Sequence, residues 1–89
     1  MEKEKAEKYI KESDILTFLS SSTFKAFADS IKLSENEEIK EILKNKVIAS
    51  IGPVTSKTIE KYGLKIGIEG KKYTEEGLFQ EILQYVMSE

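Results

Sequence analysis

The chain has 89 residues, enough for one small domain, and its 14 basic and 16 acidic residues leave a net charge of −2. This balance gives no general attraction to nucleic acid or anionic membranes, and the absence of Cys and His excludes disulfides, thiolate catalysis and the commonest metal ligands. No apolar run approaches the roughly 20 residues that cross a bilayer, so we expect a cytoplasmic location and no membrane partner.

The first part of the chain predicts a charged helix, a buried strand and an amphipathic helix. Residues 2–12 are rich in Lys and Glu at i,i+4 spacing and poor in apolar residues, which predicts a solvated helix or a frayed arm. Residues 15–19 are apolar and favour a short buried strand. The apolar residues that follow have the spacing of one helix face, and they predict a helix from Ser22 or Thr23 to about Ile31.

The middle of the chain predicts a second helix, a second strand and the start of a third helix. Ser34 and Glu37 have the spacing of a capping box, which opens a helix with a charged, solvated face. Residues 47–51 are apolar and predict the second strand. Gly52 and Pro53 suit an N-cap and the first helical position, because Pro lacks the N–H that would be left unpaired there.

The last part of the chain completes a repeated strand-helix order. Gly63 suits the left-handed residue that ends a helix, and residues 64–68 predict a third, more polar strand at a sheet edge. The last helix is expected to begin at Thr74. Its expected apolar face comprises Leu78, Phe79, Ile82, Leu83 and Val86. The aromatic residues at helical spacing are expected in the core: Phe24, Phe27, Phe79 and Tyr85.

This order predicts an α/β fold of three βα units with a parallel sheet, preceded by a helix, and residues 1–89 as a single unit. Three parallel strands make a narrow sheet, whereas such sheets are usually wider and covered on both faces. Bare edges recruit partners. We therefore expect self-association, as a homodimer, or membership of something larger.

Two strand-to-helix turns indicate where a ligand would bind. The hydroxyl run Ser20–Thr23 follows the first strand, and Gly52–Thr55 follows the second. In a parallel sheet such turns lie together at the carboxyl ends of the strands, where ligands of open α/β sheets bind. Backbone N–H groups at the following helix N-termini suit that edge to anions.

Four stretches, in their order and spacing, resemble the carboxyl-terminal segment of uroporphyrinogen-III synthase. They are Asp14–Thr23, Ile48–Thr55, Tyr62–Lys65 and Tyr73–Leu78, and together they span about residues 10–86. Leu19 departs from the family pattern, which usually has a hydroxyl residue between the Phe and the Ser run. This departure removes one polar contact at the first turn.

The resemblance implies an enzyme of heme biosynthesis that cyclises the linear tetrapyrrole hydroxymethylbilane to uroporphyrinogen III, with inversion of ring D and loss of water, without a cofactor. It also implies two flavodoxin-like-related domains with the site in the cleft between them. The chain is then expected to be the closing half of one domain. We expect it to be inactive alone and to pair with the missing half in the full enzyme.

The resemblance implies that residues of both turns bind the substrate: Ser20, Ser21, Ser22, Thr23, Gly52, Val54 and Thr55. The carboxylates of a tetrapyrrole suit the N–H donors of such turns. From the residues alone, a helix-capping run and an ordinary Gly-Pro turn remain open alternatives. Tyr73 and Thr74 are expected to be a packed Tyr and an N-cap Thr.

The sequence contains no catalytic constellation, no metal-ligand cluster and no Gly-rich phosphate loop. This fits a reaction in which the protein mainly positions its substrate and places charge. Two other functions stay open. The chain could be a structural half-domain that completes its sheet in a homodimer, or a flavodoxin-like module that binds phosphate or a nucleotide through the same helix N-termini.

Overall fold

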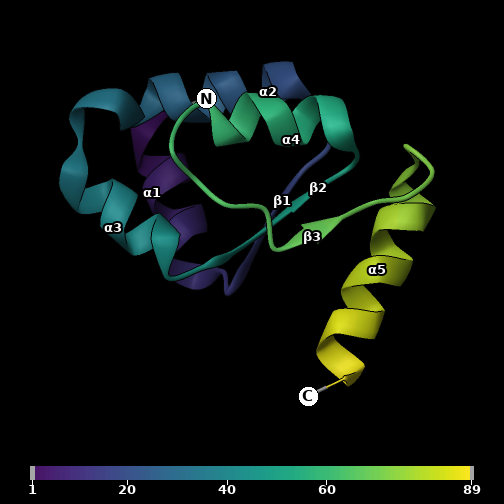
Figure 1. Ribbon diagram of the computed structural model, residues 1–89. Helices are drawn as coiled ribbons and strands as arrows, with labels where there is room; N and C mark the ends of the chain where they lie inside the picture. Colours follow the sequence, from purple (N-terminus) through teal and green to yellow (C-terminus); the bar gives the residue numbers. More distant parts are fainter. Residues whose placement is uncertain (1, 89) are drawn as a thin grey trace.

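A computed structural model describes residues 2–88 of the chain (Figure 1). Its elements follow in the order α1 (Lys3–Glu12), β1 (Ile15–Phe18), α2 (Ser21–Ser30), the 3-10 helix η1 (Leu33–Glu35), α3 (Glu37–Lys44), β2 (Val47–Ser50), α4 (Pro53–Glu60), β3 (Ile68–Glu69) and α5 (Glu75–Met87). The predicted α/β class with a leading helix is confirmed. No helix within this part of the chain combines the length and apolar character needed to cross a membrane.

The three strands form one parallel sheet in the order β1-β2-β3. Ile15 pairs with Val47 and Phe18 with Ser50, so β1 and β2 match over their full length. β3 adds a short pairing, with Ile68 beside Ala49. Because each strand passes through a helix before the next parallel strand, the predicted βα units are confirmed.

Alternating strand residues supply two separate cores. Leu16, Phe18 and Ile48 face a large core with α1, α2, α3 and α4. Ala49 and Ile68 face a smaller core built with Leu78 of α5. Figure 1 shows the same division, with α1–α4 on one side of the sheet and α5 alone on the other. Because α5 packs against β2 and β3, the part of this sheet face that belongs to β1 is thinly covered.

Aromatic side chains fill the larger core and are absent from the smaller one. Phe24 and Phe27 are fully buried, as predicted, and Phe18 meets Phe24 edge-on with ring centroids 5.0 Å apart. The prediction was wrong for the aromatic residues of α5. Phe79 is 58% exposed and Tyr85 38% exposed, because α5 has a sheet on one side and no covering layer on the other among the described residues.

The predicted N-terminal helix is confirmed and most of its charged residues are exposed, but one face packs into the core, which corrects the expectation of a fully solvated helix or a frayed arm. Ala6 and Ile10 are buried, and the Tyr9 ring packs edge-on against Phe18. The Tyr9 hydroxyl accepts a hydrogen bond from the Thr17 N–H at 2.7 Å and donates to the Thr17 carbonyl at 3.3 Å. Ala6, Tyr9 and Ile10 lie at i, i+3 and i+4 and form one apolar stripe along the helix. The stripe is narrow and flanked by charged residues, so it is hard to recognise in the sequence.

Several local predictions are confirmed. Gly52 is the N-cap of α4, and Pro53 is its first residue. Gly63 adopts a left-handed φ of +85° after that helix. Thr74 caps α5, its hydroxyl accepting a hydrogen bond from the Gly77 N–H at 3.0 Å. The helix after β1 starts at Ser21, slightly earlier than predicted.

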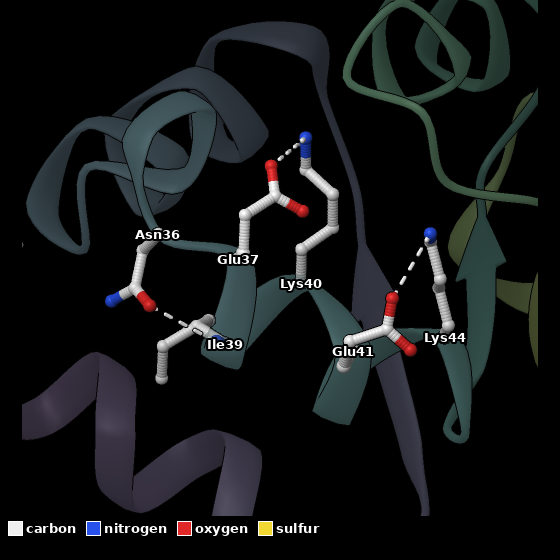
Figure 2. A network of polar contacts seen from close by, with 6 residues as sticks. All are labelled: Asn36, Glu37, Ile39, Lys40, Glu41 and Lys44. Carbon is white, nitrogen blue, oxygen red and sulfur yellow. Dashed lines mark hydrogen bonds and ion pairs between the residues drawn. The ribbon is translucent and has the colours of Figure 1, made fainter.

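The predicted capping box was wrong (Figure 2). Ser34 lies in η1, and α3 is capped by Asn36, whose side-chain oxygen accepts from the Ile39 N–H at 3.1 Å. Ser34 belongs to the 3-10 helix that precedes α3, so α3 begins two residues later than predicted. Exposed ion pairs follow along α3, such as Lys44 with Glu41 at 3.3 Å, which confirms its solvated face.

Strand boundaries are the other correction. Residues 64–68 were predicted to be the third strand, but β3 is Ile68–Glu69. Leu64 is instead buried in the larger core, which draws the chain away from β2 until Gly67 donates to the Ile48 carbonyl at 2.9 Å. The first two strands each end one residue earlier than predicted, and Leu19 is 42% exposed.

Candidate functional site

The turn after β1 is a capped helix start. The Ser20 hydroxyl accepts from the Thr23 N–H at 3.0 Å and donates to the Thr23 hydroxyl at 2.7 Å. Ser22 is exposed and lies within 3.3 Å of the Ser20 hydroxyl. The capping alternative is therefore correct for Ser20, and it leaves the substrate-binding prediction for this turn open.

The structure brings the two predicted turns together. The Ser21 hydroxyl donates to the Val54 carbonyl at 3.5 Å, and the Thr58 hydroxyl donates to the Ser21 hydroxyl at 3.1 Å. These bonds join α2 to the first turns of α4, and Figure 1 shows the two helices side by side over the sheet. Residues more than thirty positions apart in the sequence thus lie together at the edge of the sheet where β1 and β2 end.

The N-termini of α2 and α4 carry the partial positive charge of their helix dipoles. By helix geometry, the N–H groups of Ser21, Ser22, Val54 and Thr55 have no acceptor inside their own helices. No acidic residue lies in the first turn of either helix, whereas the first turns of α3 and α5 each contain two. The partial positive charge of α2 and α4 is therefore not offset by their own side chains.

The predicted site residues differ in how far they reach the surface. The Val54 side chain is 65% exposed, whereas Thr55 is 4% exposed and Gly52 is buried. In the first turn, Ser22 and Thr23 are exposed, and Ser20 and Ser21 are partly buried. A ligand at this edge would meet hydroxyls mainly from α2, and mainly backbone from α4.

A buried polar chain beneath the second turn escaped the sequence analysis. The Ser50 hydroxyl donates to the Ser56 hydroxyl 2.5 Å away and lies 3.2 Å from the Gly52 carbonyl oxygen. Ser56 in turn donates to the Glu69 carboxylate at 2.6 Å. The chain ties β2, α4 and β3 together and holds the Gly52–Pro53 turn in place. In the sequence, the feature that pointed to these buried contacts was Ser50, a polar residue at the end of an apolar strand.

A third turn, before α5, reaches the same edge. Tyr73 has a left-handed φ of +55° and its side chain is 59% exposed, so the expectation of a packed Tyr is wrong. A Cβ added to Gly52 would lie 2.6 Å from two carbons of the Tyr73 ring, which shows how closely the ring approaches the backbone. Gly70 allows this loop to approach as well, because a Cβ there would lie 2.7 Å from the Ile51 carbonyl oxygen.

Comparison with known proteins identifies the family. The family model described as "Uroporphyrinogen-III synthase HemD" matches residues 1–80. The chain belongs to the uroporphyrinogen-III synthase family. This confirms the resemblance seen in the four sequence stretches, and it places the chain in a family of heme biosynthesis.

A curated member of the family gives the scale of the similarity. A protein of Methanocaldococcus jannaschii with the name "Putative uroporphyrinogen-III synthase" is 43% identical over 72 residues. The match covers 81% of this chain and 28% of that protein, so the chain spans less than a third of the length of its relative. No solved structure matches the chain.

Proposed function

We propose that the edge formed by the turns after β1 and β2 is one wall of a tetrapyrrole site, in a protein that converts hydroxymethylbilane to uroporphyrinogen III. Family membership supports this reaction. The observation that carries the proposal is the pairing of two helix N-termini without acidic residues, held together by the contact between Ser21 and Val54. Carboxylates of a linear tetrapyrrole match such donors.

The role of this wall is to bind and orient. Hydroxymethylbilane loses its terminal hydroxyl, together with the N–H proton of the same pyrrole, as water. Ring D attacks the electron-poor carbon through its α-carbon that already carries a bridge; this bridge bond breaks and re-forms at the other α-carbon, which gives up its proton. The outcome depends on how the chain of four rings is folded at that moment, so fixed carboxylates direct the reaction. The backbone N–H groups of Val54 and Thr55 and the hydroxyls of Ser22 and Thr23 supply this anchoring without transferring a proton.

A coupled assay tests the proposal. Porphobilinogen and hydroxymethylbilane synthase generate the linear tetrapyrrole in the presence of the 89-residue chain, and chromatography of the oxidised products separates the isomers. We expect the type I isomer, which forms spontaneously, because the chain supplies one wall. The isolated chain should nevertheless bind uroporphyrin III. Type III product above the enzyme-free control would contradict the inactivity of the chain alone, and absence of uroporphyrin binding would contradict the site.

A second candidate function is self-association, and the exposed apolar surface of α5 favours it. Phe79, Leu83 and Val86 are each at least 42% exposed along that helix. Beside them, a hollow of about 580 Å³ is lined by Thr17, Leu19, Glu75, Glu76, Leu78, Phe79 and Ile82. Apolar surface of this kind marks interaction sites. The oligomeric state in solution tests this candidate.

A further inference from the structure

Tyr73 is held in a backbone conformation that its side chain does not favour. Its φ of +55° lies in the left-handed region, which bulky residues rarely adopt. Gly or Asn at this position would adopt the same conformation at less cost. The cap of α5 does not require a Tyr, because it is made by the hydroxyl of Thr74. Strain of this kind concentrates at binding and catalytic sites.

Burial does not account for the ring either. A Tyr retained for packing would have most of its surface covered, but 59% of Tyr73 is exposed. The ring lies close to the Cα of Gly52, where the missing side chain leaves room for the ring edge. The strained residue thus places an aromatic ring against the N-cap of α4 and leaves much of it open to solvent.

The surroundings of the ring combine an apolar surface with anion donors. The ring rests against Gly52, which is the N-cap of α4. The N–H groups of Val54 and Thr55, which have no acceptor inside the helix, lie two and three residues further along the chain. A pyrrole with acidic side chains has the matching pattern, an aromatic face with carboxylates at its rim. Stacking on the ring and hydrogen bonds from the helix N-terminus could then act on one pyrrole unit together.

We propose that Tyr73 is a ligand-contacting residue, whose ring stacks against a pyrrole while the N-terminus of α4 holds a carboxylate of the same unit. This inference rests on the proposed function, because it names a further residue of the same site. It predicts that the ring of Tyr73 matters for binding and that its hydroxyl matters less.

The experiment measures binding and stability on the same variants of the 89-residue chain. Uroporphyrin III is titrated into the ¹⁵N-labelled protein, and dissociation constants are taken from amide shifts. Tyr73→Asn keeps the left-handed backbone and removes the ring, and Tyr73→Phe removes the hydroxyl alone. Tyr85→Ala, an exposed aromatic residue of α5, is the matched control. Thermal unfolding of each variant is followed by circular dichroism.

We expect Tyr73→Asn to bind about tenfold more weakly, the scale of a lost aromatic stacking contact, with a Tm equal to or above that of the unchanged chain. Tyr73→Phe and Tyr85→Ala should retain their affinity. Equal affinity of Tyr73→Asn and the unchanged chain, with the unchanged chain binding well, would overturn the inference and leave the proposed function standing. Failure of the unchanged chain to bind would overturn both.

A second measurement does not depend on the folding of a variant. In the complex of the unchanged chain, ring protons of Tyr73 should show nuclear Overhauser effects to the porphyrin. Their absence, in a complex whose amide shifts map to Val54 and Thr55, would overturn the role of Tyr73 even if Tyr73→Asn unfolded.

Discussion

At the level of single residues, the hydroxyls beneath the second turn link the elements that form the site. Ser56 both contacts Ser50 and donates to Glu69, so one side chain links three elements. Because Ser50 and Ser56 are almost fully buried, their polar atoms depend on each other for hydrogen bonds. Removing Ser56 leaves the buried Ser50 hydroxyl without this partner, whereas the exposed Glu69 can bond to water instead.

Ser56→Ala should therefore lower the free energy of unfolding by about 1–2 kcal/mol, the cost of leaving buried polar groups unpaired. Urea unfolding followed by circular dichroism measures this change. Ser34→Ala serves as control, because Ser34 is exposed in η1. Equal stability of the two variants would show that the buried chain contributes nothing.

Among the elements, helix starts decide how the charges of the molecule are distributed. Acidic residues occupy the first turns of α3 and α5, which are capped by Asn36 and Thr74. The first turns of α2 and α4 lack acids, and both lie at the proposed binding edge. The two helices whose dipoles are not offset by acidic residues in the first turn are thus the two that meet through Ser21 and Val54.

The cap of α3 gives a prediction at this scale. Asn36→Ala should destabilise the protein by about 1 kcal/mol, because the Ile39 N–H loses its side-chain acceptor. Ser34→Ala should have almost no effect, although the sequence favoured Ser34 as the cap. Urea unfolding of both variants checks the pair, and a larger loss for Ser34→Ala would restore the capping box.

In the whole molecule, the faces and edges of the sheet are unequally protected. The backbone of Thr17 at the lateral edge of β1 is bonded by the Tyr9 hydroxyl, so a strand from another copy would have to displace α1 to pair there. The apolar surface of α5 has no such cover among residues 2–88. A second copy would therefore dock more readily on α5 than along β1.

Sedimentation equilibrium tests this view of the assembly. The unchanged chain should show a mass approaching that of a dimer as its concentration rises, and Phe79→Glu should remain monomeric, because a charge is costly inside an apolar contact. Ala26→Glu, an exposed substitution on α2 across the sheet, is the matched control and should behave like the unchanged chain. A monomer at all concentrations without substitution would refute self-association.

Local features of the sequence determined most of the architecture. The apolar runs at β1 and β2, the Gly52–Pro53 helix start and the left-handed Gly63 depend on neighbours within a few residues, so they could be predicted without a structure. The four family stretches likewise identified the family before any contact was known. The two turns were placed at one sheet edge by the rule for parallel strands.

The tertiary structure decided the features that depend on distant partners. One face of helix α1 is buried because Phe18 and Phe27 offer it a surface, and β3 is short because Leu64 is drawn into the larger core. The bonds from Ser56 to Glu69 and the seat of Tyr73 on Gly52 join residues of separate elements. No local pattern encodes such contacts, since their energy appears only once the elements are packed together.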